Sequence, residues 1–91
     1  MSDAGSCMRF NNAAQRILGD TARPVIRVEE TNDRENRWSA EARFVGPSGN
    51  DLGPVVGQGS ARKKQKAKDI AAMSGLEWLR SQYPWVDLSD V

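Results

Sequence analysis

The sequence predicts a small α+β domain in the order α-β-β-β-α, with a three-stranded antiparallel sheet and both helices packed on one face. Apolar residues with helical spacing near both ends of the chain, and two-residue alternation between them, lead to this prediction. The connections are also too short for the crossover that parallel strands require. At 91 residues, 38% of them hydrophobic and 27% charged, the chain has the size and composition of one globular domain.

The two ends of the chain are expected to lie outside this domain. Residues 1–7 are predicted to form a disordered leader, residues 8–82 the domain, and residues 83–91 a short acidic tail. Cys7 is the only cysteine, so no intrachain disulfide is expected, and the start of the chain does not resemble a secretory signal. These features predict an intracellular protein and leave cytoplasm and nucleus open. No apolar run approaches the roughly 20 residues needed to span a bilayer, so no membrane association is expected.

A first helix is expected over residues 8–18, where the apolar residues can share one broad side. Those residues are Met8, Phe10, Ala14, Ile17 and Leu18. Gly19 and Asp20 are expected to end the helix, and Pro24 cannot continue it.

A first strand is expected over residues 25–30, followed by a polar turn or loop over residues 31–36. Residues 37–44 then show the most regular alternation in the chain, which predicts one buried and one solvated face. The residues of the buried face are Trp38, Ala40, Ala42 and Phe44. Both aromatic residues are therefore assigned to the core rather than to an exposed stacking surface.

Residues 46–51 are dense in turn-forming residues, and residues 52–58 are expected to form a third, irregular strand because they contain two glycines and a proline. Ser60 is the expected N-cap of a second helix that runs from about Ala61 to Gln82. The apolar stripe of this helix consists mainly of small residues, which would allow close approach to a neighbouring backbone. Its members are Ala67, Ala71, Ala72, Gly75, Leu76 and Leu79.

Five positive charges fall within residues 62–68, namely Arg62, Lys63, Lys64, Lys66 and Lys68. This segment contains none of the 12 acidic residues, so the rest of the chain has eight Lys and Arg against twelve Asp and Glu, a net charge of −4. Cations at a helix N-terminus are mildly unfavourable, and like charges four residues apart repel by a few tenths of a kcal/mol. The segment therefore costs stability, which favours a role in binding an anion, such as phosphate, over that of a solvated surface.

The second-helix segment and the order of the strands together resemble the double-stranded-RNA-binding domain family. Residues 67–76 fit the family pattern Ala-Lys-x-x-Ala-Ala-x-x-Ala-Leu, with Gly75 in place of an alanine. The glycines of Gly57-Gln58-Gly59 and the following lysines are similar to the family's approach to this helix. The resemblance covers residues 8–80. It departs from the family at Gln65, where a lysine is usual, and in the first interstrand loop, which lacks the family's Gly-Pro-x-His.

The resemblance implies binding of duplex RNA by shape and phosphate contacts with little sequence preference, and three contact regions. The middle contact would come from Lys63, Lys64 and Lys68, with Arg62 and Lys66 in support. One outer contact, to the minor groove, would come from Asn11, Asn12 and Gln15. The other would come from Arg34, Asn36 and Arg37.

An enzyme is not expected, because the chain has no histidine and no nucleophile–base pair or metal-ligand cluster is evident. Neither a cofactor nor a small-molecule substrate is expected. Gly57-Gln58-Gly59 lacks the third glycine of a dinucleotide-binding fingerprint. The alternative left open is a protein-interaction module of the same fold, which would dimerise or dock a protein partner with weak or no RNA binding.

Overall fold

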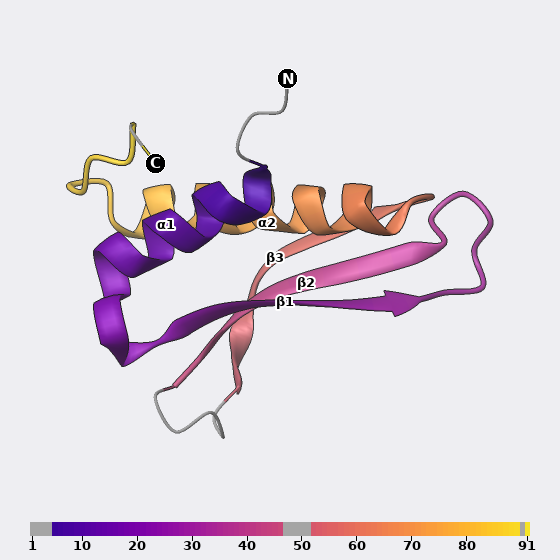
Figure 1. Ribbon diagram of the computed structural model, residues 1–91, viewed down its shortest axis with the longest axis horizontal. Coiled ribbons are helices and arrows are strands. Elements are labelled where there is room, and N and C mark those ends of the chain that lie inside the picture. The colour runs from indigo at the N-terminus through magenta and orange to yellow at the C-terminus, as the bar shows by residue number, and fades with distance from the viewer. Residues whose placement is uncertain (1–4, 47–51, 90) are drawn as a thin grey trace.

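The computed structural model describes residues 5–46, 52–89 and 91, and it has the predicted α-β-β-β-α order. The three strands form one antiparallel sheet in the order β1-β2-β3, and both helices lie on the same face of it (Figure 1). A short 3-10 turn, η1, joins the first helix to the sheet. The bounds are α1 Ser6–Leu18, η1 Gly19–Thr21, β1 Arg23–Glu30, β2 Trp38–Val45, β3 Leu52–Ala61 and α2 Lys64–Gln82.

The core is the layer between the helices and the sheet. Phe10 and Leu79 are its largest fully buried side chains, and alanines of both helices and of β2 fill much of the remaining space. The Phe44 ring lies 5.6 Å from the ring of Phe10 and 6.0 Å from that of Trp78, centroid to centroid. The assignment of Phe44 to the core is therefore confirmed, although its side chain is only partly buried, as is that of Trp38.

The backbones of α2 and β3 approach unusually closely, because glycines on the strand face small residues on the helix. A Cβ added at Gly57 would lie 2.4 Å from the carbonyl oxygen of Ala71, and one at Gly59 would lie 2.6 Å from the Ala71 nitrogen. A Cβ added at Gly75 would lie 2.6 Å from the ring of Phe10. The family pattern has alanine at position 75, and the chain has glycine there because a Cβ would collide with the Phe10 ring.

Several element boundaries differ from the sequence prediction. The first helix begins at Ser6 rather than Met8, because the Gly5 carbonyl accepts hydrogen bonds from the N–H groups of Met8 and Arg9. Residues 5–7 are therefore not part of a disordered leader, and residues 1–4 lie outside the described residues. The first strand begins at Arg23 and includes Pro24, which an edge strand tolerates because it need not donate to a neighbour on both sides.

The start of the second helix was also predicted too early. Ser60 is paired with Ser39 inside the extended third strand, so it is not the N-cap. The N-cap is Lys63, whose side chain makes no capping hydrogen bond. Most of the predicted turn over residues 46–51 lies outside the described residues.

The C-terminal residues pack against the domain instead of forming a separate tail. Leu88 is 4% exposed and belongs to the main core cluster, together with residues of both helices. Two arginines of α1 hold this segment: Arg9 donates to the carbonyl oxygen of Val91 at 3.4 Å, and Arg16 donates to that of Asp87 at 2.8 Å. The prediction that the domain ends at residue 82 was therefore wrong, because apolar side chains of residues 83–91 complete the core.

Replacing Gly57 with alanine is expected to lower the free energy of unfolding by roughly 1–3 kcal/mol, the usual range for overpacking a core. The new methyl group would meet backbone atoms of α2, which cannot move without displacing the helix. Urea unfolding followed by circular dichroism measures the change. The control is Gln58→Ala at the neighbouring, exposed position of β3, which adds no atom between the strand and α2. Equal stability of the Gly57→Ala variant and the parent would contradict the close approach.

Candidate functional site

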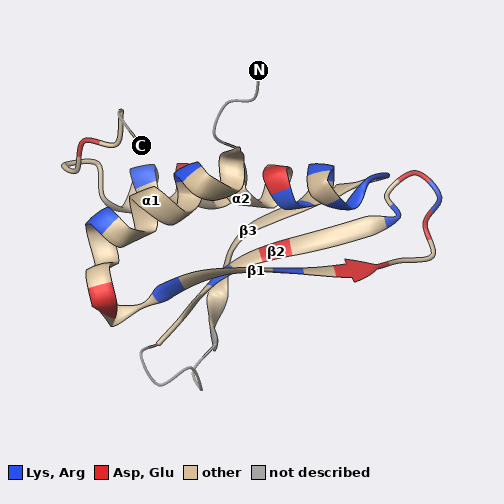
Figure 2. Ribbon diagram, viewed as in Figure 1, with Lys and Arg blue, Asp and Glu red and all other residues tan. Residues whose placement is uncertain are grey.

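The predicted basic segment lies where β3 passes into α2, and Figure 2 shows its basic residues at this end of the helix. Arg62, Lys63, Lys64 and Lys66 are exposed, and Lys68 is partly buried. In the part of the chain that the structure describes, none of the five is paired with a carboxylate. The site therefore keeps its full positive charge.

The helix start adds backbone donors to these cations. The Lys63 carbonyl accepts the N–H of Ala67 at 3.1 Å, which leaves the N–H groups of Lys64, Gln65 and Lys66 without intrahelical acceptors. The side chain of the N-cap residue Lys63 does not cap them, and the first turn of α2 contains no acidic residue. Unsatisfied N–H groups beside ammonium groups favour an anion with several oxygen acceptors, such as phosphate.

Helix geometry separates the lysines of α2 into two groups. Lys64 and Lys68 are four residues apart and share one side of the helix, whereas Lys66 lies on the opposite side. The Lys64 ammonium lies 5.6 Å from the ring centroid of Trp38. Lys68 lines a pocket with Cys7 and Asn11, so this one cation of α2 lies beside the first part of α1.

Gln65 contacts Asp69 of the same helix, and Asp69 in turn contacts Cys7 of α1. The Gln65 amide donates to Oδ1 of Asp69 at 3.1 Å, and the thiol of Cys7 contacts the same oxygen at 3.8 Å. Burial raises the pKa of the Cys7 thiol, and the negative charge of Asp69 raises it further against the opposing effect of Lys68. The thiol therefore stays protonated and serves as a packing and hydrogen-bonding group.

The predicted polar residues of α1 form an exposed surface next to this cluster. Asn11, Asn12 and Gln15 are all exposed, and none of their side chains makes a hydrogen bond with another described residue. Asn11 shares the pocket that Lys68 lines. The structure thus places one residue of the first predicted outer contact, Asn11, beside one residue of the middle contact, Lys68.

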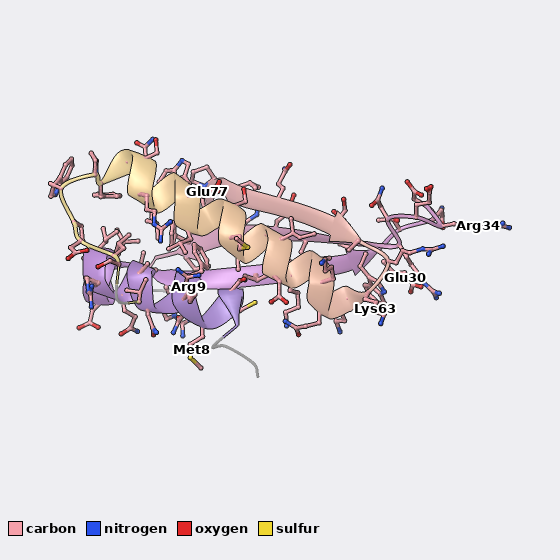
Figure 3. The ribbon with its side chains drawn as sticks, turned by 90° about the horizontal axis from the view of Figure 1, so that it is seen from above. Met8, Arg9, Glu30, Arg34, Lys63 and Glu77 are labelled. Atoms are coloured by element: carbon pink, nitrogen blue, oxygen red, sulfur yellow. The ribbon has the colours of Figure 1, made fainter. Side chains whose placement is uncertain are left out.

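The β1–β2 loop, which was predicted to supply the other outer contact, differs from the α1 surface because it contains an ion pair and internal hydrogen bonds. Arg37 donates to Oε2 of Glu30 at 2.6 Å, and the main chain is fixed by hydrogen bonds to Thr31 and Asp33. Arg34 and Asn36 are exposed, and Figure 3 shows Arg34 at the outer tip, beyond the end of α2 where Lys63 lies.

Charge further separates this loop from the basic segment. From residue 29 to residue 37 there are four acidic side chains against two arginines. The acidic residues are Glu29, Glu30, Asp33 and Glu35. The loop is therefore less suited to an anionic ligand than the start of α2.

Sequence reasoning missed the contact between Trp38 and Lys64. Alternation along β2 assigns Trp38 to the core, and it does pack against the cluster formed by Ala40, Ala67 and Ala71. Its position at the first residue of the strand leaves the ring only partly buried, within reach of the first residue of α2. No pattern in the sequence relates these two residues, which are 26 positions apart.

Comparison with known proteins adds no assignment: no protein-family model matches the chain, and no curated protein matches it. Among the described residues, no group of His, Cys, Asp and Glu is arranged to hold a metal ion. Within the same part of the chain, no helix is both long and apolar enough to cross a membrane.

Replacing Lys66 with glutamate is expected to raise the free energy of unfolding by about 0.3–1 kcal/mol, because an acidic side chain in the first turn complements the helix dipole. Urea unfolding measures the change. The control is Arg80→Glu, the same charge change in the last turn of α2, which is expected to lower stability by a similar amount. If Lys66→Glu were destabilising, the cations would be contributing to the fold rather than opposing it.

Proposed function

We propose that this protein binds double-stranded RNA without catalysis, by shape and phosphate contacts and with little sequence preference. The observation that carries the proposal is the set of five cations at the start of α2, which have no carboxylate partner among the described residues, together with the exposed amides of α1, of which Asn11 shares a pocket with Lys68. The resemblance of residues 67–76 to the double-stranded-RNA-binding domain family supports the same function.

The chemistry of these two surfaces suits an A-form duplex. Such a duplex displays 2′-hydroxyl groups across a wide, shallow minor groove, and phosphates line its deep, narrow major groove. The ammonium and N–H groups at the start of α2 would contact the phosphates. Asn11, Asn12 and Gln15 would contact the minor groove, since an amide both donates to and accepts from a 2′-hydroxyl group.

The β1–β2 loop would contribute less than the other two regions. Arg37 is exposed but ion-paired with Glu30, so Arg34 and Asn36 are the exposed polar residues of the predicted contact without an ion pair among the described residues. A domain with three contacts spans about 16 base pairs, and weakening one outer contact would shorten the effective footprint. Modest affinity is expected from one such module.

A second candidate function, association with a second copy of this chain, is favoured by the outer edge of the sheet. β3 is an edge strand with unpaired backbone groups along one side, and a second copy offers an identical edge. Ile70 and Met73 of α2 are 37% and 50% exposed, and Ile70 lines a pocket with Gly59 and Ser60 of this strand. These apolar side chains would be covered if two such edges paired.

A titration at low salt with duplexes of about 20 base pairs separates the two functions, since this length exceeds the roughly 16 that such a domain spans. We expect the RNA duplex to bind more tightly than an RNA–DNA hybrid, and the DNA duplex to bind least. Neutralising about three phosphates gives an expected slope of −2 to −3 for the logarithm of affinity against the logarithm of salt concentration. Fluorescence anisotropy measures the affinities.

The site is tested in the same assay with Lys64→Glu combined with Lys68→Glu, which is expected to remove measurable binding while the fold remains. The matched control is Arg23→Glu combined with Arg80→Glu, which changes the net charge equally at exposed positions outside the basic segment. Equal loss in both variants would contradict the site. No binding by the parent, together with association that depends on protein concentration, would favour the second function.

A further inference from the structure

Trp38 lies at the junction between the sheet and the start of α2. It is the first residue of β2 and is paired with Glu30 of β1 on one side and with Ala61 of β3 on the other. Its side chain packs against the cluster that contains Ala67 of α2. Backbone pairing on both sides and packing on the helix therefore fix the ring.

The Lys64 ammonium lies over this fixed ring, 5.6 Å from its centroid. That distance is within the roughly 6 Å over which the electron-rich face of tryptophan attracts a cation. Other forces act against Lys64 at this place, because the helix N-terminus and Lys68, four residues later, both repel it. The contact with the Trp38 ring offsets part of this repulsion.

We infer that Trp38 is a positioning residue for the proposed RNA contact: its ring holds the Lys64 ammonium in the place where a phosphate is bound. The inference rests on the proposed function. The ring covers only one side of the ammonium, so the N–H donors on the other side remain available for phosphate oxygens. A lysine that is already restricted loses less side-chain freedom on binding than one that moves freely.

The first test concerns the free protein and does not depend on RNA. Ring currents of Trp38 are expected to shift the ε-methylene protons of Lys64 upfield in the nuclear magnetic resonance spectrum. Trp38→Phe is expected to retain part of this shift, and Trp38→Leu is expected to remove it. Ordinary lysine shifts in the parent protein would overturn the inference, and circular dichroism verifies that each variant is folded.

The second test is a double-mutant cycle of Trp38→Leu and Lys64→Met, measured as affinity for the RNA duplex. Trp38→Leu is expected to weaken binding about two- to fivefold when Lys64 is present. This loss corresponds to the free energy of an exposed cation–π contact. Trp38→Leu is expected to have no further effect in the Lys64→Met background, and Trp38→Phe is expected to restore most of the affinity.

The outcomes separate the inference from the proposed function. An equal loss from Trp38→Leu in both backgrounds, in a protein that binds the duplex, would overturn the role of Trp38 alone. Failure of the parent protein to bind, or unchanged affinity of Lys64→Met, would overturn the RNA contact at Lys64 and the inference with it. If Lys64→Met leaves the affinity unchanged, the ring-current shift still reports whether Trp38 and Lys64 are in contact.

Discussion

The close contact between the backbones of α2 and β3 is the constraint on which the rest of the structure depends. Gly57 and Gly59 leave no side chain between the strand and the helix, and Ala67, Ala71 and Gly75 let the helix settle onto it. The same contact fixes where α2 begins relative to the sheet. It therefore determines where the lysines of the first turns project, and it brings Lys64 over the ring of Trp38.

The positive charges of residues 62–68 destabilise the start of α2, and the packing of α2 against the sheet compensates for this cost. Five cations surround an uncapped helix start that has no acidic residue in its first turn, an arrangement disfavoured by both the helix dipole and mutual repulsion. The buried small-residue face along α2 holds the helix in place despite this cost. An anion bound at the start of the helix would reverse the sign of both unfavourable effects, which is the physical reason for assigning the site to phosphate groups.

The fold followed from residue periodicity, because alternation in β2 and helical spacing in α1 and α2 agree with the turn residues between them. Boundaries were less predictable: Ser60 resembles an N-cap, but pairing with Ser39 extends β3 past it. Residues 83–91 look acidic and separate, yet Leu88 completes the core. The basic cluster was identifiable from charge, whereas the pairing of Arg37 with Glu30 and the Trp38–Lys64 contact depend on tertiary geometry.

The most direct test is to map the backbone amide shifts of the protein as an RNA duplex is added, since the proposed RNA contacts lie on one defined surface. The largest changes are expected at residues 63–68 of the α2 start and at residues 11–15 of α1, with smaller changes in the β1–β2 loop. Changes concentrated along the outer edge of β3 and at Ile70 and Met73, or no changes at the start of α2, would contradict RNA binding at the start of α2.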